Sequence, residues 1–436
     1  KKIGIGLLGL GTVGSGVANI ILNPENRHPL VSEIELLGVA VKDINRPRKV
    51  SIPRGILNSD PYQIVNNPEI KLIVEVMGGI EPAKDLIMQA IRNGKSVVTA
   101  NKAVIARYGN ELAAEANANN VYVLIEAAVG GGIPIIEPLK QSLGGNKINK
   151  VTGIINGTTN YILSRMAKEG VEFSKVLKRA QDLGYAESDP ASDIEGLDAA
   201  DKIAILSGLA FGGSINRASI STKGIENLQS RDVNYATKLG YQVKLLAIAE
   251  RMDSIKNKID SLPLAVRVQP TLIPNEHPLS GVNGVNNAIL IEGEPIGEVM
   301  FYGPGAGAGP TASAVVADIL NIAGISKLEN SSNQLDPLLA ANSWRNCHLV
   351  EPSEIIQSNY IRLITNDSPG VIGKIGRIFG LENVSIQSIV QFDSSSSEAE
   401  IVVITHEVKQ GQVKKSLDQI RGLNEVKEIA SHMGCV

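Results

Sequence analysis

The feature that most constrains the fold is the alternation of short apolar runs with helical patterns over the first third of the chain. The apolar runs are continuous in valine, isoleucine and leucine, which indicates strands covered on both faces. They lie at 3–8, 35–41, 72–76, 96–99 and 121–125, with helical stretches at 13–22, 82–92 and 104–117. This succession predicts an α/β domain with a Rossmann-type, doubly wound parallel sheet and right-handed crossovers.

The rest of the chain divides by pattern into further segments, and its 436 residues suit about three domains. The order βαββαβ near the end is that of the split-βαβ ferredoxin-like unit. Within the middle segment, apolar periodicity predicts a helix over 233–250. We expect a nucleotide-binding domain at 1–134 plus about 303–326, an α+β domain at 135–302, a polar linker at 327–354 and a last domain at 355–436.

Charge and composition exclude several classes of protein. Lys and Arg number 42 against 45 Asp and Glu, a net charge of −3, which argues against nucleic-acid and membrane partners. The two cysteines have no ligand spacing, so we expect no disulfide framework and a reducing, cytoplasmic setting. The sequence has no continuous run of about 18 apolar residues, and its opening residues predict a strand rather than a signal peptide.

A glycine motif, GLGTVG at 9–14, follows the first predicted strand and opens the first predicted helix. In this context Gly9 makes the tight turn, Gly11 lets the backbone approach a pyrophosphate, and Gly14 allows close packing of helix and strand. The helix N-terminus attracts phosphate with unpaired N–H groups. The motif predicts dinucleotide binding; the alternative is a tight turn that binds nothing.

Cofactor choice depends on the residues after the second strand. Lys42 favours the 2′-phosphate of NADP, whereas an acidic residue such as Asp43 would favour NAD. An inserted loop at 23–29 obscures the register, and Lys42 could also be a solvated lysine. Lys102, at the end of a predicted parallel strand, is placed to contact a cofactor, or else faces solvent at a helix start.

The most informative stretch is 180–202, in which seven carboxylates accompany one cation, Lys202. Asp198 and Lys202 are four residues apart on an apolar helix and share a face. Such a lysine can be a tuned acid or base, or only half of a solvated surface pair. The polar sequence NGTTN at 156–160 could offer donors to a carboxylate, or could simply cap a helix.

At this stretch the chain closely resembles the homoserine dehydrogenases. The residues that match the family signature are Ala180, Gly184, Tyr185, Ala186, Asp189, Pro190, Asp193, Ile194, Gly196, Asp198 and Lys202. Supporting stretches are GLGTVG, TANKA, EAAVGGGIP, NGTTNY and GPGAGAGPTAS. The sequence NDSPGV at 366–371 resembles the first loop of an ACT regulatory domain.

The resemblance implies reversible reduction of L-aspartate 4-semialdehyde to L-homoserine by NAD(P)H. The alkoxide formed on hydride transfer needs a proton, which an ammonium group can supply while stabilising the charge. Lys202 is the candidate donor, and Asp198 would hold the substrate against it. Further substrate contacts are expected from Glu187, Asp193, Thr158 and Gly184. Cofactor contacts are expected from Gly9, Gly11, Thr12, Val13, Gly14, Lys42, Lys102 and Gly303.

The resemblance also implies two sites away from the chemistry. A structural Na⁺ or K⁺ would bind to the carboxylate of Glu126 and the carbonyl oxygens of Val129, Gly131 and Ile133. A regulatory amino acid, expected to be L-threonine, would bind in the ACT domain to Asp367, Pro369, Gly370, Val371, Asn383 and Ile386. ACT domains commonly pair and the family's substrate domain dimerises through a sheet, so we expect a homodimer or homotetramer.

Two alternatives remain to be weighed against this interpretation. Aspartate-semialdehyde dehydrogenase has a related framework but needs a nucleophilic cysteine. Cys347 lies in the predicted linker and Cys435 is the second-last residue, so neither falls in the substrate domain. The other alternative is a catalytically silent amino-acid sensor that uses only the ACT domain; the intact glycine motif and the Asp198–Lys202 pair argue against it.

Overall fold

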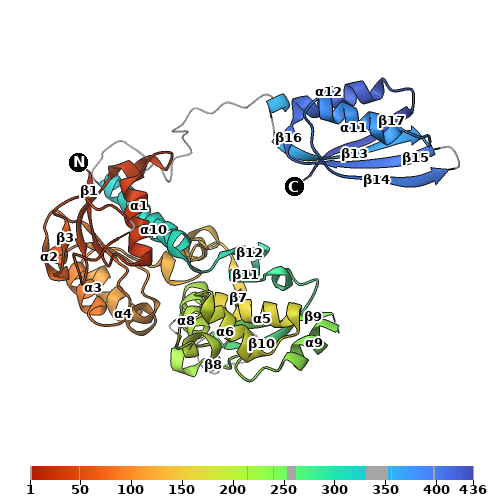
Figure 1. Ribbon diagram of the computed structural model, residues 1–436. Helices are drawn as coiled ribbons and strands as arrows, with labels where there is room; N and C mark the ends of the chain where they lie inside the picture. Colours follow the sequence, from red (N-terminus) through yellow and green to blue (C-terminus); the bar gives the residue numbers. More distant parts are fainter. Residues whose placement is uncertain are drawn as a thin grey trace. The chain divides into compact units, whose positions relative to one another are not determined.

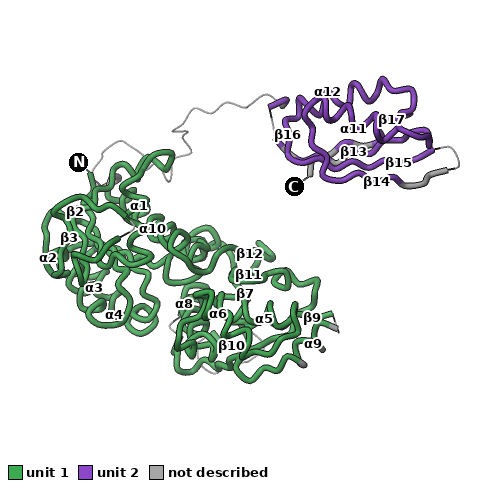
Figure 2. Tube along the Cα trace, viewed as in Figure 1, with its two compact units in different colours: residues 1–342 green, residues 343–436 purple. Residues whose placement is uncertain are grey.

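The computed structural model describes residues 2–48, 50–213, 215–238, 240–252, 262–329, 352–354, 356–395 and 398–435. The chain forms two compact units, 1–342 and 343–436 (Figure 2). Within the described residues, the first unit contains two six-stranded sheets and the second unit a separate five-stranded sheet (Figure 1).

The first sheet is parallel throughout and has the strand order β3-β2-β1-β4-β5-β6. The predicted Rossmann-type sheet is therefore confirmed. Strands and helices are β1 (Ile3–Leu8), α1 (Thr12–Leu22), β2 (Ile34–Ala40), β3 (Leu57–Asn58), α2 (Pro61–Asn66), β4 (Leu72–Glu75), α3 (Ala83–Arg92), β5 (Ser96–Thr99), α4 (Lys102–Ala118) and β6 (Val123–Leu124). The strand order reverses between β1 and β4, where ligands of such sheets bind.

Helix α10 (Ala308–Glu329) comes late in the sequence but packs beside α1 (Figure 1). Its Ala312, Val315 and Ile319 are fully buried in the core that also holds Ile5 and Val17. By length and composition α10 could cross a membrane, and it is the one such helix among the described residues. Half of that apolar stretch is buried inside the protein, as is usual for a core helix.

The second sheet is mostly antiparallel, in the order β12-β11-β7-β9-β10-β8. Its strands are β7 (Lys147–Ile154), β8 (Ser221–Thr222), β9 (Tyr241–Arg251), β10 (Leu264–Pro274), β11 (Asn286–Glu294) and β12 (Gly297–Pro304). The helices beside it are α5 (Gly157–Glu169), α6 (Phe173–Asp182), α7 (Ala191–Ile194), α8 (Leu197–Phe211) and α9 (Ser230–Lys238). The main hydrophobic core of this domain lies between α5, α6, α8 and the sheet.

The predicted helix over 233–250 is wrong. Helix α9 ends at Lys238, Gly240 has a φ of +84°, and β9 begins at Tyr241. Residues 243–249 are buried continuously because one core covers one face of β9 and a second cluster, with Leu246 and Ile248, covers the other. A fully buried strand has no alternation, so its periodicity does not distinguish it from a buried helix.

Strand β9 also carries Lys244, which is 1% exposed. Its Nζ donates to the carbonyl oxygen of Val282 at 2.5 Å and to Oδ1 of Asn283 at 3.0 Å. Burial lowers the pKa of Lys244 to about 8. A buried ammonium is tolerated here because neutral oxygens accept its hydrogen bonds.

The second unit has the predicted βαββαβ order and an antiparallel sheet. Its elements are β13 (Ile356–Asn366), α11 (Val371–Leu381), β14 (Ile386–Ser395), β15 (Glu398–Thr405), β16 (Val408–Lys409), α12 (Gln410–Arg421) and β17 (Val426–Cys435). The strands lie in the order β14-β15-β13-β17, with β16 paired to the start of β13. Most of the predicted linker, 327–354, lies outside the described residues.

Candidate active site

The glycine motif forms the turn between β1 and α1. Gly9 has a φ of +102°, and a Cβ there would lie 2.9 Å from the carbonyl oxygen of Val76; a Cβ on Gly14 would collide with the carbonyl of Gly9. Gly11 differs, since a Cβ there would meet nothing within 4 Å. Gly9 and Gly14 therefore allow tight packing, whereas Gly11 leaves backbone open to a ligand.

A cavity of about 1060 Å³ opens beside this turn. Gly9, Gly11, Thr12 and Lys42, four of the predicted cofactor residues, line it. Its volume lies at the upper end of the range for pockets that bind small molecules and cofactors. Of the other predicted cofactor contacts, Gly14 is buried beneath the turn, and Val13, Lys102 and Gly303 are not among the residues that line the cavity.

The cavity has a cationic rim that sequence reasoning found only in part. Arg46 and Arg48 line it together with Lys42 and Asp43. The guanidinium of Arg48 donates to the carbonyl oxygens of Asp43, Ile44 and Arg46, which folds the loop after β2. The missed signal is RPR at 46–48, directly after the Lys42 considered for NADP.

A buried carboxylate, Asp198, lies at the centre of the second site. It is 3% exposed, and its Oδ2 lies 2.7 Å from Nζ of Lys202. Its Oδ1 accepts a hydrogen bond from Lys102, which lies 96 residues earlier, at the start of α4. Two ammonium groups, one from α4 beside the first sheet and one from α8 beside the second, thus share one carboxylate.

The neighbouring lysines set the ionisation state of Asp198. Burial alone would raise the pKa of Asp198, but the ammonium groups of Lys202 and Lys102 hold it far below its usual value. Burial likewise opposes the charge of Lys102, and Asp198, by its charge and hydrogen bond, raises the pKa of that lysine. Asp198 is therefore anionic and Lys102 cationic at neutral pH.

Lys202 lies in the interior. Its side chain is 12% exposed, and its Nζ donates to the carbonyl oxygen of Ile155 at 2.8 Å as well as to Asp198. The alternative of a solvated surface pair is therefore wrong. The same spacing in Lys178 and Asp182 does form such a pair, with side chains 72% and 61% exposed.

Asn156 is a member of this site that sequence reasoning missed. Its Nδ2 donates to Oδ1 of Asp193 at 2.7 Å and to Oδ2 of Asp198 at 3.0 Å. Its Oδ1 accepts from the N–H of Thr159, so it also caps α5, as the alternative reading of NGTTN proposed. The helix cap fixes the orientation of the Asn156 side-chain amide, and this amide bridges the predicted substrate residues Asp193 and Asp198.

The other predicted substrate residues lie on or beside the loop after α6. The hydroxyl of Thr158 donates to the carbonyl of Tyr185 at 2.7 Å, which ties that loop to the start of α5. Gly184 is exposed and has a φ of +75°, which suits the turn at the end of the helix. Glu187 is exposed, and Gln181 donates to its backbone carbonyl.

The predicted cation site contains an acidic cluster. The Glu126 carboxylate accepts from the N–H groups of residues 135–137 at 2.5–2.8 Å. One carboxylate oxygen each from Glu126, Glu137 and Asp318 lies within 4.8 Å of the others. Asp318 is fully buried; its Oδ2 accepts from the N–H of Glu126 and its Oδ1 has no partner. Burial and then the neighbouring carboxylates raise the pKa of Asp318 to about 8.

The candidate regulatory loop connects β13 to α11 in the second unit. Gly370 caps α11 with a φ of +88°, and Val371 is buried as the first residue of the helix. Oδ1 of Asp367 accepts from Nε2 of Gln391 on β14 at 3.2 Å, and Asn383 has a φ of +57° in the turn before β14. Pro369 is exposed, and Ile386 begins β14.

Comparison with known proteins identifies the family. A homoserine dehydrogenase model matches residues 134–320, the NAD-binding domain model of the same enzymes matches 9–126, and an ACT model matches 359–425. The chain is 52% identical to homoserine dehydrogenase of Synechocystis sp. over 98% of both chains. It belongs to the homoserine dehydrogenase family. The Bacillus subtilis homoserine dehydrogenase is 40% identical over 99% of this chain and 98% of its own.

Solved structures agree with this membership. A homoserine dehydrogenase from Thiobacillus denitrificans matches with a TM-score of 0.70 and 39% identity, over 100% of this chain and 98% of that one. A hyperthermophilic archaeal homoserine dehydrogenase solved with NADPH matches with a TM-score of 0.62 and 28% identity, over 74% and 98%. As a member of the homoserine dehydrogenase family, the chain is an NAD(P)-dependent oxidoreductase that acts on a CH–OH group, so the sensor-only alternative is wrong.

Proposed function

We propose that the site around Asp198 reversibly reduces L-aspartate 4-semialdehyde to L-homoserine, with Lys202 as the proton donor. The observation that carries this proposal is the pairing of one buried carboxylate with Lys102 and Lys202. When bound along the glycine motif, the nicotinamide cofactor supplies or accepts a hydride. Lys202 gives its proton to the new alkoxide, and Lys102 adds positive charge where negative charge develops.

In this proposal the acidic residues bind the other end of the substrate. Asp193, held by Asn156, and the exposed Glu187 would pair with the substrate's ammonium group. The start of α5, beside Thr158, would present N–H groups to its carboxylate. Turnover of L-homoserine with NADP or NAD by the purified chain tests the proposal, and a failure to form L-aspartate 4-semialdehyde would contradict it.

The cationic rim of the cofactor cavity favours NADP over NAD. Lys42, Arg46 and Arg48 place three cations at the end of β2, where the adenosine ribose of a dinucleotide lies in such folds. A 2′-phosphate prefers guanidinium and ammonium groups. The NADPH in the solved archaeal relative is in keeping with this preference.

A monovalent cation, Na⁺ or K⁺, would fit beside Glu126. Three carboxylate oxygens lie close together, and Oδ1 of Asp318 is buried without a partner. Hard oxygen donors suit such ions. Glu126, Asp318 and Glu137 would hold the cation, together with the carbonyl oxygens of Val129, Gly131 and Ile133 that the family resemblance implies. The cation would join the 126–137 segment to α10.

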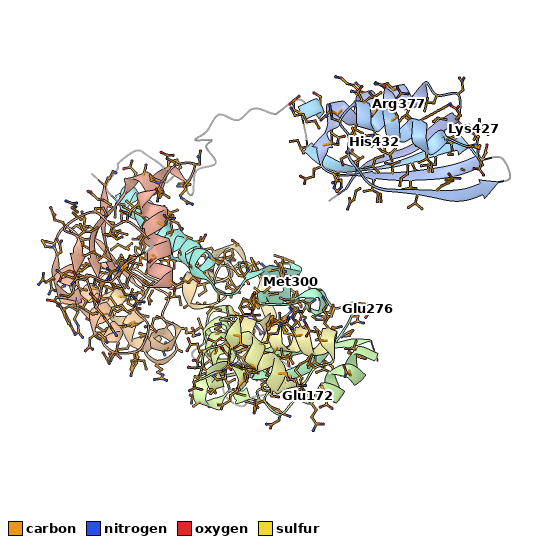
Figure 3. All side chains as sticks on the ribbon, in the orientation of Figure 1. Glu172, Glu276, Met300, Arg377, Lys427 and His432 are labelled. Carbon is orange, nitrogen blue, oxygen red and sulfur yellow. The ribbon has the colours of Figure 1, made fainter. Side chains whose placement is uncertain are left out.

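The ACT unit, as a regulatory module that binds amino acids, is proposed to respond to L-threonine through the loop around Asp367 and the turn at Asn383. The second sheet is proposed to form a homodimer contact: Met300 (Figure 3) and Tyr302 on its edge strand are 40% and 54% exposed. An exposed apolar sheet edge of this kind invites a second copy. Pairing of ACT units would extend the dimer to a tetramer, and a reducing cytoplasm remains the proposed location.

A further inference from the structure

Glu75 is a buried charged residue that the proposed mechanism leaves without a role. It ends β4 and is fully buried at the carboxyl end of the sheet, between β1 and β5. No cation lies within 4 Å of its carboxylate in the described part of the chain. An isolated buried carboxylate is costly, so its presence calls for a reason beyond packing.

Two donors satisfy this carboxylate, one from the loop after β4 and one from the end of β5. The N–H of Met77, in the loop after β4, donates to Oε1 at 2.8 Å. The hydroxyl of Thr99, at the end of β5, donates to Oε2 at 2.6 Å. Since the hydroxyl hydrogen points to Glu75, the lone pairs of Thr99 are free to accept, and they accept from the N–H of Asn101 at 3.0 Å.

Asn101 completes the connection to α4. Its Nδ2 donates to the carbonyl of Gly79 at 2.6 Å, and its Oδ1 accepts from the N–H of Val104 as the cap of the helix. Lys102 is the first residue of that helix and bonds to Asp198. The hydrogen bonds therefore run without interruption from Glu75, through Thr99 and Asn101, to the turn that carries Lys102.

We infer that Glu75 is a positioning residue: through Thr99 it sets the turn at Asn101 so that Lys102 meets Asp198. This inference rests on the proposed role of Lys102. The carboxylate matters because each of its two oxygens accepts a hydrogen bond from one of the two donors. A glutamine would accept one bond but present an NH₂ group to the other donor, and would turn the Thr99 hydroxyl around.

Four variants test the inference. Glu75→Gln removes the charge, Thr99→Val removes the relay at nearly constant shape, and Thr99→Ser keeps the hydroxyl as the matched control. Lys102→Met removes the group that is positioned. The readouts are kcat and KM for aldehyde reduction, NADPH binding by fluorescence, and the melting temperature of each purified full-length variant.

A misplacement of about 1 Å can cost about 100-fold in rate, so we expect Glu75→Gln and Thr99→Val to lower kcat about 10- to 100-fold. Thr99→Ser should stay within about threefold of the parent. Thr99→Val should change NADPH affinity little, because Thr99 is not among the residues that line the cofactor cavity, whereas Met77, which Glu75 holds, is. In the Lys102→Met background, Glu75→Gln should have almost no further effect, because residues that act as a unit are not additive.

Each of the other outcomes would refute a particular step of the inference. An equal loss from Glu75→Gln with and without Lys102 would show that Glu75 acts independently and would refute positioning. If Glu75→Gln and Thr99→Val both had a lower melting temperature but an unchanged kcat, Glu75 would only stabilise the fold and would not position Lys102. If Glu75→Gln does not fold, the difference in kcat between Thr99→Val and Thr99→Ser is enough to decide. Full activity of Lys102→Met would instead remove the proposed role of Lys102.

Discussion

Replacement of Lys202 by methionine is the sharpest test of the chemistry, because the chain contains its own matched control. Lys202–Asp198 and Lys178–Asp182 have the same i,i+4 spacing, with nitrogen–oxygen distances of 2.7 and 3.0 Å. They differ in exposure: the two lysine side chains are 12% and 72% exposed. Effects that come only from changing a helical lysine should therefore appear equally in both variants.

The structure sets the expected size of each effect. Loss of a general acid costs about 100- to 10,000-fold in kcat, and Lys178→Met should change kcat less than about twofold. Lys202→Met also leaves the Ile155 carbonyl without its donor, at about 1–3 kcal/mol of stability, although Asp198 keeps Lys102 and Asn156. The exposed pair of Lys178 is worth about 0.3–0.5 kcal/mol.

The assay is the loss of NADPH absorbance with L-aspartate 4-semialdehyde, beside urea unfolding of each variant. Lys202→Met should bind NADPH normally. In the parent, the Lys202 ammonium group contacts Asp198 and Ile155, and Lys202 is not among the residues that line the cavity of the glycine motif. A folded Lys202→Met that turns over within about fivefold of the parent would remove this lysine from proton transfer. A similar loss in Lys178→Met would show that the measurement reports helix stability.

Four further predictions concern the other sites. Burial lowers the pKa of Lys244 from 10.5 to about 8, so the unfolded chain binds more protons between these values. The free energy of unfolding of the parent, relative to that of Lys244→Met, should therefore rise from pH 8 to 10.5. If the free energies of both proteins changed with pH in the same way, the lowered pKa of Lys244 would be excluded. Lys42→Ala with Arg46→Ala should raise KM for NADPH at least about tenfold and leave KM for NADH nearly unchanged; equal changes would deny a 2′-phosphate site. Asp318→Asn should abolish the gain in melting temperature that NaCl gives over choline chloride, whereas an unchanged gain would place the cation elsewhere. L-threonine should inhibit the parent, and Asp367→Ala should raise the inhibitory concentration at least about tenfold without changing kcat; retained sensitivity would move the site.

Local patterns made most of the first sheet predictable, although strand β3 and helix α2 were not expected. β1 and β5 have the predicted bounds, because each is a short apolar run that ends at turn residues. The glycine motif is also local: the residues that make the turn are consecutive. Where the environment decides, the pattern failed, as in β9, whose burial on both faces comes from clusters assembled from distant strands and helices.

The sequence pointed to several residues of the site individually, but it did not show which of them lie together. Asp198 and Lys202 belong to a single helix turn, but the exposed pair of Lys178 and Asp182 has the same spacing, so the family signature and not the spacing identified them. The bond from Lys102 to Asp198 joins residues 96 positions apart, and the one from Asp318 to Glu126 joins residues 192 apart. Sequence spacing carries no information about such contacts. For Asn156 the sequence left a helix cap and a donor to a carboxylate as alternatives, because both need the same residue type; the structure shows that it is both.

In the proposed mechanism, charge balance gives a reason for a lysine from each domain. Asp198 with Lys202 alone would be neutral and would give a developing alkoxide no net attraction. The second carboxylate, Asp193, is bridged to Asp198 by the same amide and would make the pocket net negative. Once Asp193 pairs with the substrate's ammonium group, Lys102 and Lys202 leave one positive charge over Asp198. On this proposal the surplus exists only when α4 and α8 meet at Asp198, so the docking of the two domains would itself be part of the chemistry.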